Sequence, residues 1–279
     1  MNEKQPKILI LGADGLLGSE LVEVLSDYSP IAWVKEDCDL TNFDEIRQKV
    51  FDLSPDFIIN ATGYTAVDKA EEEVDLANKI NGEAVGVLAE VAHKLKVPIF
   101  HFSTDYVFDG QKTEGYNEND QPNPISAYGR SKYLGEKLLI QNTDQFYLIR
   151  LSWLFGRNGK NFIDSIIQKG QKLSPFKVID DQYGRPTYAK DLALRVRDFI
   201  EDRPEYGIYH LSNDGPKTTW YNLAKMSLDL KNVTVVIDPC TTEDYPLPAK
   251  RPQNSMLINN KLRSMRDWRE AVKEYLASC

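Results

Sequence analysis

The chain has 279 residues, of which 42% are hydrophobic and 27% are charged, and its net charge is -8. This composition is typical of a globular protein, and the acidic balance argues against a nucleic-acid-binding surface, which needs clustered Lys and Arg. No apolar run approaches the roughly 18 residues of a membrane helix, and the N-terminus lacks the apolar core of a signal peptide. We therefore expect a cytoplasmic protein with no nucleic-acid or membrane partner.

Five short apolar runs recur through roughly the first 150 residues, at 7–11, 31–34, 57–60, 97–103 and 146–152. Segments with helical spacing lie between them, for example residues 76–95. Strands that alternate with helices predict a parallel sheet covered on both faces, and continuously apolar strands fit burial on both sides. We predict an α/β fold: a Rossmann-type doubly wound parallel sheet with a smaller C-terminal substrate lobe.

The regular alternation weakens after about residue 153. Residues 176–188 and 207–213 are predicted to be strand ends, residues 190–201 a helix, and residues 238–257 a proline-rich loop. We place a dinucleotide-binding Rossmann domain at 1–152. The remainder, 153–279, is predicted to be mainly a substrate-binding lobe, interleaved with late Rossmann strands at about 176–213.

A glycine-rich turn follows the first predicted strand, in the segment "KILILGADGLLGSELVEVL". Gly12, Gly15 and Gly18 are spaced three apart, as G-x-x-G-x-x-G rather than G-x-G-x-x-G. Glycines allow a tight turn and a close approach to a pyrophosphate, and the N-terminus of the next helix favours its negative charge. The position between a strand and a helix favours a dinucleotide site over a simple tight turn.

The residue after the second predicted strand bears on the choice of dinucleotide. NAD sites usually place an acidic residue there to bind the ribose 2'-hydroxyl, whereas this chain has Lys35, which favours the 2'-phosphate of NADP. Glu36 and Asp37 are close enough to leave NAD open, and Lys35 could equally belong to an ordinary surface loop. Asp39 and Leu40 offer a polar and an apolar group where an adenine could lie.

The third and fourth predicted strands end in different kinds of residue. Ala61, Thr62 and Gly63 are small, so they would let a cofactor pass close to the backbone. The fourth strand runs into Thr104, Asp105 and Tyr106 within "HFSTDYVFDG". Ligands of open α/β sheets bind at such strand ends, so these side chains are candidates for a substrate site.

Tyr128 and Lys132, within "SAYGRSKYLGEK", are four residues apart and so share one face of a helix. A nearby ammonium lowers the pKa of a phenol, which would make Tyr128 a proton donor, and Thr104 could bind the same substrate oxygen. The pattern also occurs at Tyr133 with Lys137 and at 221 with 225. Tyr133 is turned by about 140° from Tyr128, so we expect it to face elsewhere.

Together these features resemble the extended short-chain dehydrogenase/reductases, and most closely, within them, the family of dTDP-4-dehydrorhamnose reductases. The segments that carry the resemblance extend from residue 12 to residue 257, and the last three are the most specific. They are "GADGLLG", "NATGYTAVDKAE", "STDYVFDG", "YGRSKYLGE", "RLSWLFG", "DQYGRPTYAKDLA" and "RPQNSML".

The resemblance implies NAD(P)H-dependent reduction of the 4-keto group of dTDP-4-dehydro-L-rhamnose to dTDP-L-rhamnose. It gives Tyr128 as the proton donor, Lys132 as its partner and as a ligand of the nicotinamide ribose, and Thr104 as a donor to the keto oxygen. Asp105 and Trp153 would contact the sugar, and Arg251 is a candidate ligand of the substrate diphosphate. The predicted cofactor-binding residues are Gly12, Gly15, Leu16, Leu17, Gly18, Lys35, Asp39, Leu40, Ala61, Thr62, Gly63, Tyr64, Thr65, Tyr128 and Lys132.

We expect NADPH as the cofactor, with NADH as the alternative, and the resemblance leaves a homodimer open. No metal ligand is predicted: family members often hold magnesium with glutamates between subunits, but Lys190 stands where a second glutamate is expected. Cys38, Cys240 and Cys279 are odd in number and far apart, which predicts neither disulfides nor a zinc site.

The same fold and glycine turn also occur in proteins with three other functions. Sister dehydratases need an Asp-Glu pair beside the threonine, and here Asp105 is followed by Tyr106. A regulatory subunit, like the methionine adenosyltransferase β-subunit, would keep the fold and lose catalytic residues, whereas Thr104, Tyr128 and Lys132 are all present. Another nucleotide-sugar reductase or epimerase is the remaining alternative.

Overall fold

The computed structural model describes residues 5–172 and 174–278. A central six-stranded sheet has the order β10-β5-β4-β3-β1-β2, and every neighbouring pair is parallel. The predicted doubly wound parallel sheet is thereby confirmed. Its strands are β1 (Ile8–Leu11), β2 (Ile31–Trp33), β3 (Phe57–Asn60), β4 (Ile99–Thr104), β5 (Phe146–Leu151) and β10 (Gly207–His210).

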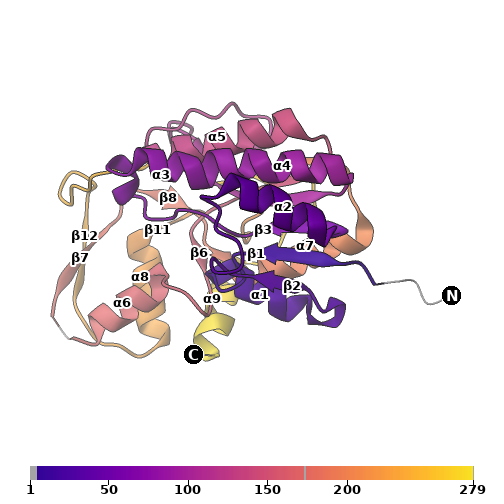
Figure 1. Cartoon of the computed structure of the whole chain (residues 1–279). Coiled ribbons are helices and arrows are strands. Elements are labelled where there is room, and N and C mark those ends of the chain that lie inside the picture. The colour runs from indigo at the N-terminus through magenta and orange to yellow at the C-terminus, as the bar shows by residue number, and fades with distance from the viewer. Residues whose placement is uncertain (1–4, 173, 279) are drawn as a thin grey trace.

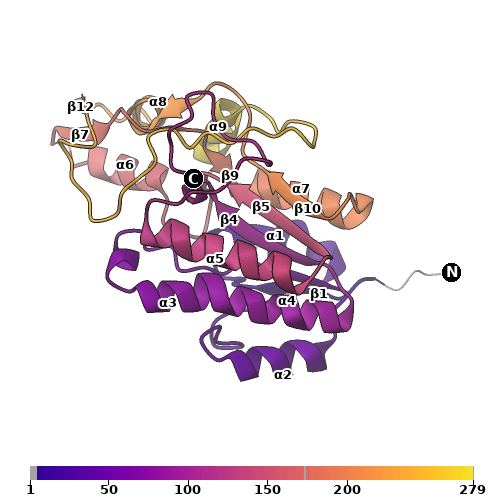
Figure 2. The same ribbon diagram turned by 90° about the horizontal axis from the view of Figure 1, so that it is seen from above.

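Helices cover both faces of this sheet (Figure 2). One face carries α1 (Leu16–Val24) and α7 (Ala189–Asp202), and the other carries α2 (Phe43–Leu53), α4 (Ala84–Leu95) and α5 (Ala127–Asn142). The chain reverses its winding between β1 and β3, because β2 lies outside β1 and β3 returns to its inner side. A crevice at the carboxyl ends of the strands is expected at this reversal.

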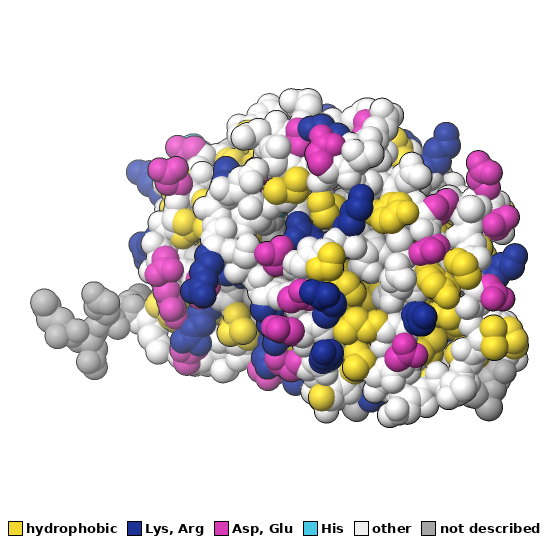
Figure 3. Space-filling model, turned by 180° about the vertical axis from the view of Figure 1, so that it is seen from behind, with side chains coloured by type: hydrophobic (Ala, Val, Ile, Leu, Met, Phe, Trp, Pro, Cys, Tyr) yellow, Lys and Arg dark blue, Asp and Glu magenta, His cyan; other side chains and the backbone are white. Residues whose placement is uncertain are grey.

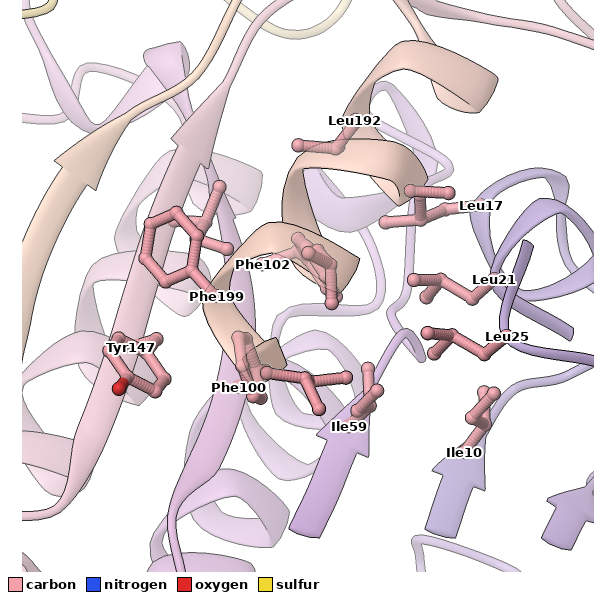
Figure 4. Packing of buried hydrophobic residues seen from close by; sticks show 14 of the residues in the cluster. Ile10, Leu17, Leu21, Leu25, Ile59, Phe100, Phe102, Tyr147, Leu192 and Phe199 are labelled. Atoms are coloured by element: carbon pink, nitrogen blue, oxygen red, sulfur yellow. The ribbon is translucent and has the colours of Figure 1, made fainter. Parts of the chain in front are cut away.

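The larger core lies between the sheet and the helices α1 and α7 (Figure 4). Leu21 of α1 lies on the side of Ile10 of β1, and Phe199 of α7 lies near Phe100 of β4. Leu17 of α1 faces Leu192 of α7, and all six side chains are buried. Full burial of one such side chain contributes about 1.5–3 kcal/mol. The core therefore holds α1 rigidly against β1, and this sets the geometry of the glycine turn between them.

The helix predicted at 76–95 is interrupted by a wider turn. It consists of α3 (Val74–Asn78), the π-helical segment η3 (Lys79–Glu83) and α4. The wide turn places Asn81 inside the molecule, where its amide accepts from the backbone N–H of Tyr64 and donates to the Ser131 hydroxyl. Asn81 thus ties the loop after β3 to helix α5, on the edge of the sheet where the strands end.

A smaller lobe lies beyond the carboxyl ends of the strands (Figure 1). Its sheets are short two-stranded pairs: β7 with β12, β8 with β11, and β6 with β9. Of the segments at 176–213, therefore, β10 joins the central sheet, α7 covers it, and β7, β8 and β9 belong to the small pairs. The elements are β6 (Leu154–Phe155), α6 (Phe162–Gly170), β7 (Phe176–Ile179), β8 (Tyr183–Gly184), β9 (Thr187–Tyr188), β11 (Thr218–Thr219), α8 (Trp220–Leu230), β12 (Ile237–Cys240) and α9 (Trp268–Ala277).

Charged side chains of both signs are interspersed on the face shown in Figure 3. Across the described residues, no helix combines the length and the apolar character that crossing a bilayer requires. Cys38 and Cys240 are buried and free, and Cys279 lies outside the residues described.

Candidate active site

A cavity of about 610 Å³ opens at the carboxyl ends of β1, β2 and β3, where the winding of the sheet reverses. Its volume is in the range of small-molecule and cofactor sites. All the residues predicted to bind the cofactor line it, except Gly18. The lining also includes Asp14, Val34, Cys38, Thr41, Leu76, Ile80 and Phe102, which were not predicted.

The glycine turn explains the shape of the floor of this cavity. Gly12 has a φ of +75°, a backbone conformation that residues with a Cβ rarely adopt. A Cβ on Gly18 would lie 1.9 Å from the carbonyl oxygen of Gly12, so Gly18 allows α1 to start directly against the turn. Gly18 therefore shapes the cofactor cavity without lining it, and the N-terminus of α1 faces the open space.

Lys35 and Asp39 lie on the wall formed by the end of β2. Lys35 is exposed, while Glu36 and Asp37 do not line the cavity. Asp39 accepts from the backbone N–H and the hydroxyl of Thr41, at 2.8 and 2.9 Å, and these bonds hold its pKa below the usual range. The wall thus carries one exposed cation and one carboxylate fixed by hydrogen bonds.

Lys35→Asp is expected to shift cofactor preference from NADPH toward NADH. The substitution replaces the exposed cation with a carboxylate, which repels a 2'-phosphate and can accept from a 2'-hydroxyl. The ratio of kcat/KM for the two cofactors measures the effect, and we expect it to change several-fold. An unchanged ratio would show that Lys35 is an ordinary surface residue, and Lys96→Asp, outside the cavity, is the matched control.

A second cavity, of about 490 Å³, lies between the end of β4 and the smaller lobe. Thr104, Asp105, Tyr106 and Trp153 line it. The two cavities share the lining residues Thr65, Ser103, Tyr128, Leu151 and Leu154. Tyr128 therefore lies where a ligand in one cavity meets a ligand in the other.

Tyr128 is enclosed at this junction. Burial raises the pKa of its phenol to about 12, and a hydrogen bond with the side chain of Thr104 opposes that rise. The expected lowering of this pKa by Lys132 is therefore wrong in direction, because the loss of solvation is the largest effect on it and raises it. At neutral pH Tyr128 retains its proton, which is the state that a proton donor requires.

Lys132 lies one helical turn after Tyr128, and it is also buried, at 4% exposure. Its ammonium donates to the carbonyl of Phe102 at 2.6 Å. Burial lowers the pKa of Lys132 to about 8, and the charge of Glu136 acts in the opposite direction. Lys132 therefore carries its charge at neutral pH and loses it in mildly alkaline solution.

The two other tyrosine-lysine pairs lie elsewhere, as predicted for Tyr133. Tyr133 packs against a cluster that contains Phe108 and Leu257, and the Lys137 ammonium lies 5.1 Å from its ring centroid. The pair at 221 and 225 lines a separate hollow of the smaller lobe. Neither pair lines the two cavities described above.

Asp105 is almost fully buried, with 2% of its surface exposed. Its carboxyl group accepts from the Thr104 hydroxyl at 3.0 Å and from the Ser255 hydroxyl. Burial raises its pKa to about 7, while these hydrogen bonds act to lower it. Asp105 thus fixes Thr104 and joins the loop around Ser255 to the end of β4.

Asp105→Asn is expected to flatten the pH dependence of stability. In wild type the unfolded carboxyl ionises near its usual value of 3.8 and the folded one near 7. The folded state holds the extra proton between these values, so stability falls as pH rises, by up to about 1.4 kcal/mol per unit. Urea unfolding at pH 5 and pH 7 would measure this, and equal slopes for both proteins would contradict it.

Trp153 follows β5 with a φ of +48°, in the left-handed region. This conformation costs an ordinary residue about 1–3 kcal/mol and persists where surrounding contacts impose it. The indole stacks on Trp220 of α8, with centroids 3.6 Å apart. It also lies over Gly184, where a Cβ would come within 2.7 Å of the ring. These contacts hold the indole at the wall of the second cavity.

Arg251 forms a bidentate ion pair with Asp68, with N–O distances of 3.0 and 2.8 Å. The backbone N–H of Ala249 donates to the same carboxylate. Arg251 does not line the second cavity, whereas the exposed Lys160 does. A contact between Arg251 and a diphosphate would therefore require its guanidinium to exchange partners, and this role stays a prediction.

Several residues of the site were not predicted. Ser255 lies within the segment "RPQNSML" and Asp68 within "NATGYTAVDKAE", so the resemblance covered both residues. It did not indicate that Ser255 bonds to Asp105 or that Asp68 pairs with Arg251. Trp220 and Phe162 reach the second cavity from helices far away in the sequence. In the described part of the chain, no three His, Cys, Asp or Glu side chains form a group suited to a metal ion.

The doubly wound sheet, with a cavity at its winding reversal that joins a second cavity, is the arrangement expected of a dinucleotide-dependent enzyme of the extended short-chain dehydrogenase/reductase class. A family model described as the RmlD substrate binding domain matches residues 6–279. The chain belongs to this family, and the resemblance to dTDP-4-dehydrorhamnose reductases is confirmed.

Named relatives cover nearly the whole chain. A dTDP-4-dehydrorhamnose reductase of Aggregatibacter actinomycetemcomitans is 37% identical, over 97% of this chain and 98% of its own. A spore coat polysaccharide biosynthesis protein, SpsK, of Bacillus subtilis (strain 168) is 36% identical, over 97% of this chain and 96% of its own.

A solved structure of dTDP-4-dehydrorhamnose reductase from Bacillus anthracis in complex with NADP has a TM-score of 0.95. It is 34% identical, over 99% of this chain and all of the other. A solved structure of a dTDP-4-dehydrorhamnose reductase from Clostridium acetobutylicum has a TM-score of 0.93. It is 38% identical, over 98% of this chain and 99% of the other.

Proposed function

We propose that this protein reduces the 4-keto group of dTDP-4-dehydro-L-rhamnose, with NADPH, to give dTDP-L-rhamnose. The observation that carries the proposal is the place of Tyr128, a protonated phenol at the junction of a dinucleotide-sized cavity and a second cavity lined by polar and aromatic groups. Relatives similar over nearly their whole length, named dTDP-4-dehydrorhamnose reductases, support the choice of substrate.

The residues of the first cavity fit a dinucleotide. The turn at Gly12 and Gly18 brings the backbone and the N-terminus of α1 to the cavity, where a pyrophosphate can bind. When bound, the reduced nicotinamide supplies the hydride. NADPH is the preferred form because Lys35 lines the wall and Glu36 does not, and NADH remains the alternative.

The chain's own groups would complete the reduction. Thr104 and Tyr128 both line the second cavity and bond to each other, which supports a role for both in binding the keto oxygen. For this, the Thr104 hydroxyl would turn its proton from Asp105 to the keto oxygen. Tyr128 would donate its proton to that oxygen, which becomes the new hydroxyl group. The resulting phenolate is stabilised by the charge of Lys132, one helical turn away.

The alternatives are less well supported. Dehydration needs a second carboxylic acid beside Thr104, and this position holds Tyr106. Burial raises the pKa of the Tyr106 phenol above its usual value, so this residue is not a base at neutral pH. A regulatory role would not need a tyrosine, a threonine and a lysine assembled at one junction. An epimerase from Thermus thermophilus shares the fold, with a TM-score of 0.81, but at 17% identity this similarity concerns the fold alone.

Trp153→Ala and Arg251→Ala are each expected to raise the KM for the nucleotide sugar by about tenfold, the equivalent of about 1.4 kcal/mol. The Kd for NADPH should hardly change, because neither residue lines the first cavity. Titration calorimetry with NADPH and steady-state kinetics measure the two effects. If both mutants bind NADPH poorly or melt early, the two residues are structural.

Asp68→Asn distinguishes two roles of Arg251. It weakens the ion pair and leaves the guanidinium in place. If Arg251 acts by binding the diphosphate, Asp68→Asn should leave the KM at or below the wild-type value, because the ion pair that competes for the guanidinium is weakened. If Arg251 acts by anchoring its loop, Asp68→Asn should raise the KM as much as Arg251→Ala does.

The proposed function is tested by incubating the protein with NADPH and a panel of nucleotide 4-keto-6-deoxysugars. Loss of absorbance of the reduced cofactor follows turnover, and product analysis identifies the sugar. We expect the highest kcat/KM with the dTDP-linked 4-dehydro-L-rhamnose. Binding of NADPH without turnover of any member would instead favour the regulatory role. A homodimer remains a prediction, which sedimentation of the purified chain would test.

A further inference from the structure

Helix α5 is joined to the end of strand β4 at three successive turns. Tyr128 bonds to the side chain of Thr104, and Lys132 donates to the carbonyl of Phe102. One turn further, Glu136 accepts from the hydroxyl of Ser103 at 2.6 Å. The residues 128, 132 and 136 thus form one stripe along the helix, and each contacts one of three consecutive residues of the strand.

Glu136 is the acidic member of this stripe, and it is buried, with 1% of its surface exposed. It forms a bidentate ion pair with Arg150 of β5, at 2.9 and 2.7 Å. Ser103 and Arg150 are opposite each other on the paired strands β4 and β5. The Glu136 carboxylate therefore joins α5 to two strands of the sheet at once.

Lys132 has a different environment. Its ammonium is buried against a neutral carbonyl, and among the described residues it takes part in no ion pair. A buried ammonium without a nearby anion tends to lose its proton. Lys132 needs its charge if it is to stabilise a phenolate at Tyr128, and a carboxylate at Glu136, one turn away, is placed to support that charge.

We propose that Glu136 is a positioning residue of the reduction, which fixes the part of α5 that carries Tyr128 and Lys132 against β4 and β5 and supplies the buried negative charge that supports the Lys132 ammonium. It acts through Lys132 and does not line either cavity. Its role in turnover rests on the proposed function. Its effect on Lys132 does not, and this allows the two to be tested separately.

None of the other titratable groups named below carries a negative charge that could support the Lys132 ammonium. Burial lowers the pKa of His101 on β4 well below its usual value, and it lowers that of His210 on β10 to about 3. Both histidines are neutral at the pH of interest. Tyr128 is protonated, and Arg150 is a cation that bonds to His210 as well as to Glu136. Glu136 is the neighbour whose charge raises the pKa of Lys132.

The test compares Glu136→Gln with wild type by NMR titration of lysine side-chain resonances, with Lys132 assigned from the spectrum of Lys132→Arg. We expect the pKa of Lys132 to fall by about one unit or more, since the variant deletes the anion and leaves the Arg150 cation. The alkaline limb of the kcat profile should move to lower pH by a similar amount. At pH 8 a fall of one unit from about 8 leaves about a tenth of Lys132 charged instead of half, which corresponds to about a fivefold loss of kcat.

Asp191→Asn is the matched control. Asp191 on α7 also forms a bidentate ion pair with an arginine, Arg266, and lines neither cavity. It should leave the pKa of Lys132 unchanged. Glu136→Asp, which keeps the charge, should return that pKa toward the wild-type value. An unchanged pKa in Glu136→Gln, or an equal shift in Asp191→Asn, would overturn the proposal.

Two further measurements keep the test decisive. If the unpaired Arg150 prevents Glu136→Gln from folding, the double variant Glu136→Gln with Arg150→Met removes both charges, and a smaller fall in the pKa of Lys132 is expected because the Arg150 cation no longer adds to it. If wild type fails to turn over any nucleotide sugar, the proposed function fails, and the NMR titration still decides whether Glu136 sustains the charge of Lys132.

Discussion

Tyr128→Phe is expected to reduce kcat by about 100-fold to 10,000-fold, the range that general acid catalysis typically contributes. The substitution deletes the phenol oxygen at the junction of the two cavities and leaves the ring in place. The ring also packs edge-on against Tyr106, with centroids 5.8 Å apart, and this contact is retained. Affinity for NADPH should therefore change little.

Single-turnover reduction with saturating NADPH measures this effect without interference from product release. Tyr133→Phe is the control, because Tyr133 belongs to the same helix and to a Tyr-x-x-x-Lys pattern but packs in a separate apolar cluster. It should keep wild-type turnover. Wild-type-like turnover of Tyr128→Phe would remove Tyr128 from the mechanism.

Gly18→Ala is expected to abolish cofactor binding at ordinary concentrations and to destabilise the fold. The added methyl group would lie 1.9 Å from the carbonyl oxygen of Gly12, and a backbone atom cannot move aside as a flexible side chain can. Either α1 shifts away from the turn or the turn opens. Overpacking of this kind costs about 1–3 kcal/mol or more, and both movements distort the floor of the first cavity.

The measurements are NADPH binding by fluorescence and the free energy of unfolding in urea. Ser19→Ala is the matched control, because it also places alanine in the first turn of α1, at a position whose hydroxyl makes one weak contact with the backbone of Leu16 at 3.4 Å. It should leave both quantities near their wild-type values. Equal NADPH affinity in Gly18→Ala would mean that the close contact does not govern the cavity.

The central sheet could be predicted because its strands are short, continuously apolar and separated by helical periodicity. These signals are local, and the five predicted strands coincide with β1 to β5 to within two residues at each end. The smaller lobe has strands of two residues at β6, β8, β9 and β11. Such strands are set by their partners rather than by a pattern of their own, so the sequence indicated their region and not their pairing.

The sequence by itself determined the doubly wound sheet, the glycine turn and the preference for Tyr128 over Tyr133, because each follows from spacing along one strand or one helix. The tertiary structure decided what depends on distant partners and on burial. Arg251 pairs with Asp68, Trp153 stacks on Trp220, and Glu136 joins α5 to β4 and β5. Burial also reverses the expected shift in the pKa of Tyr128. The loss of solvation at a site depends on every segment that encloses it, and no local pattern records that enclosure.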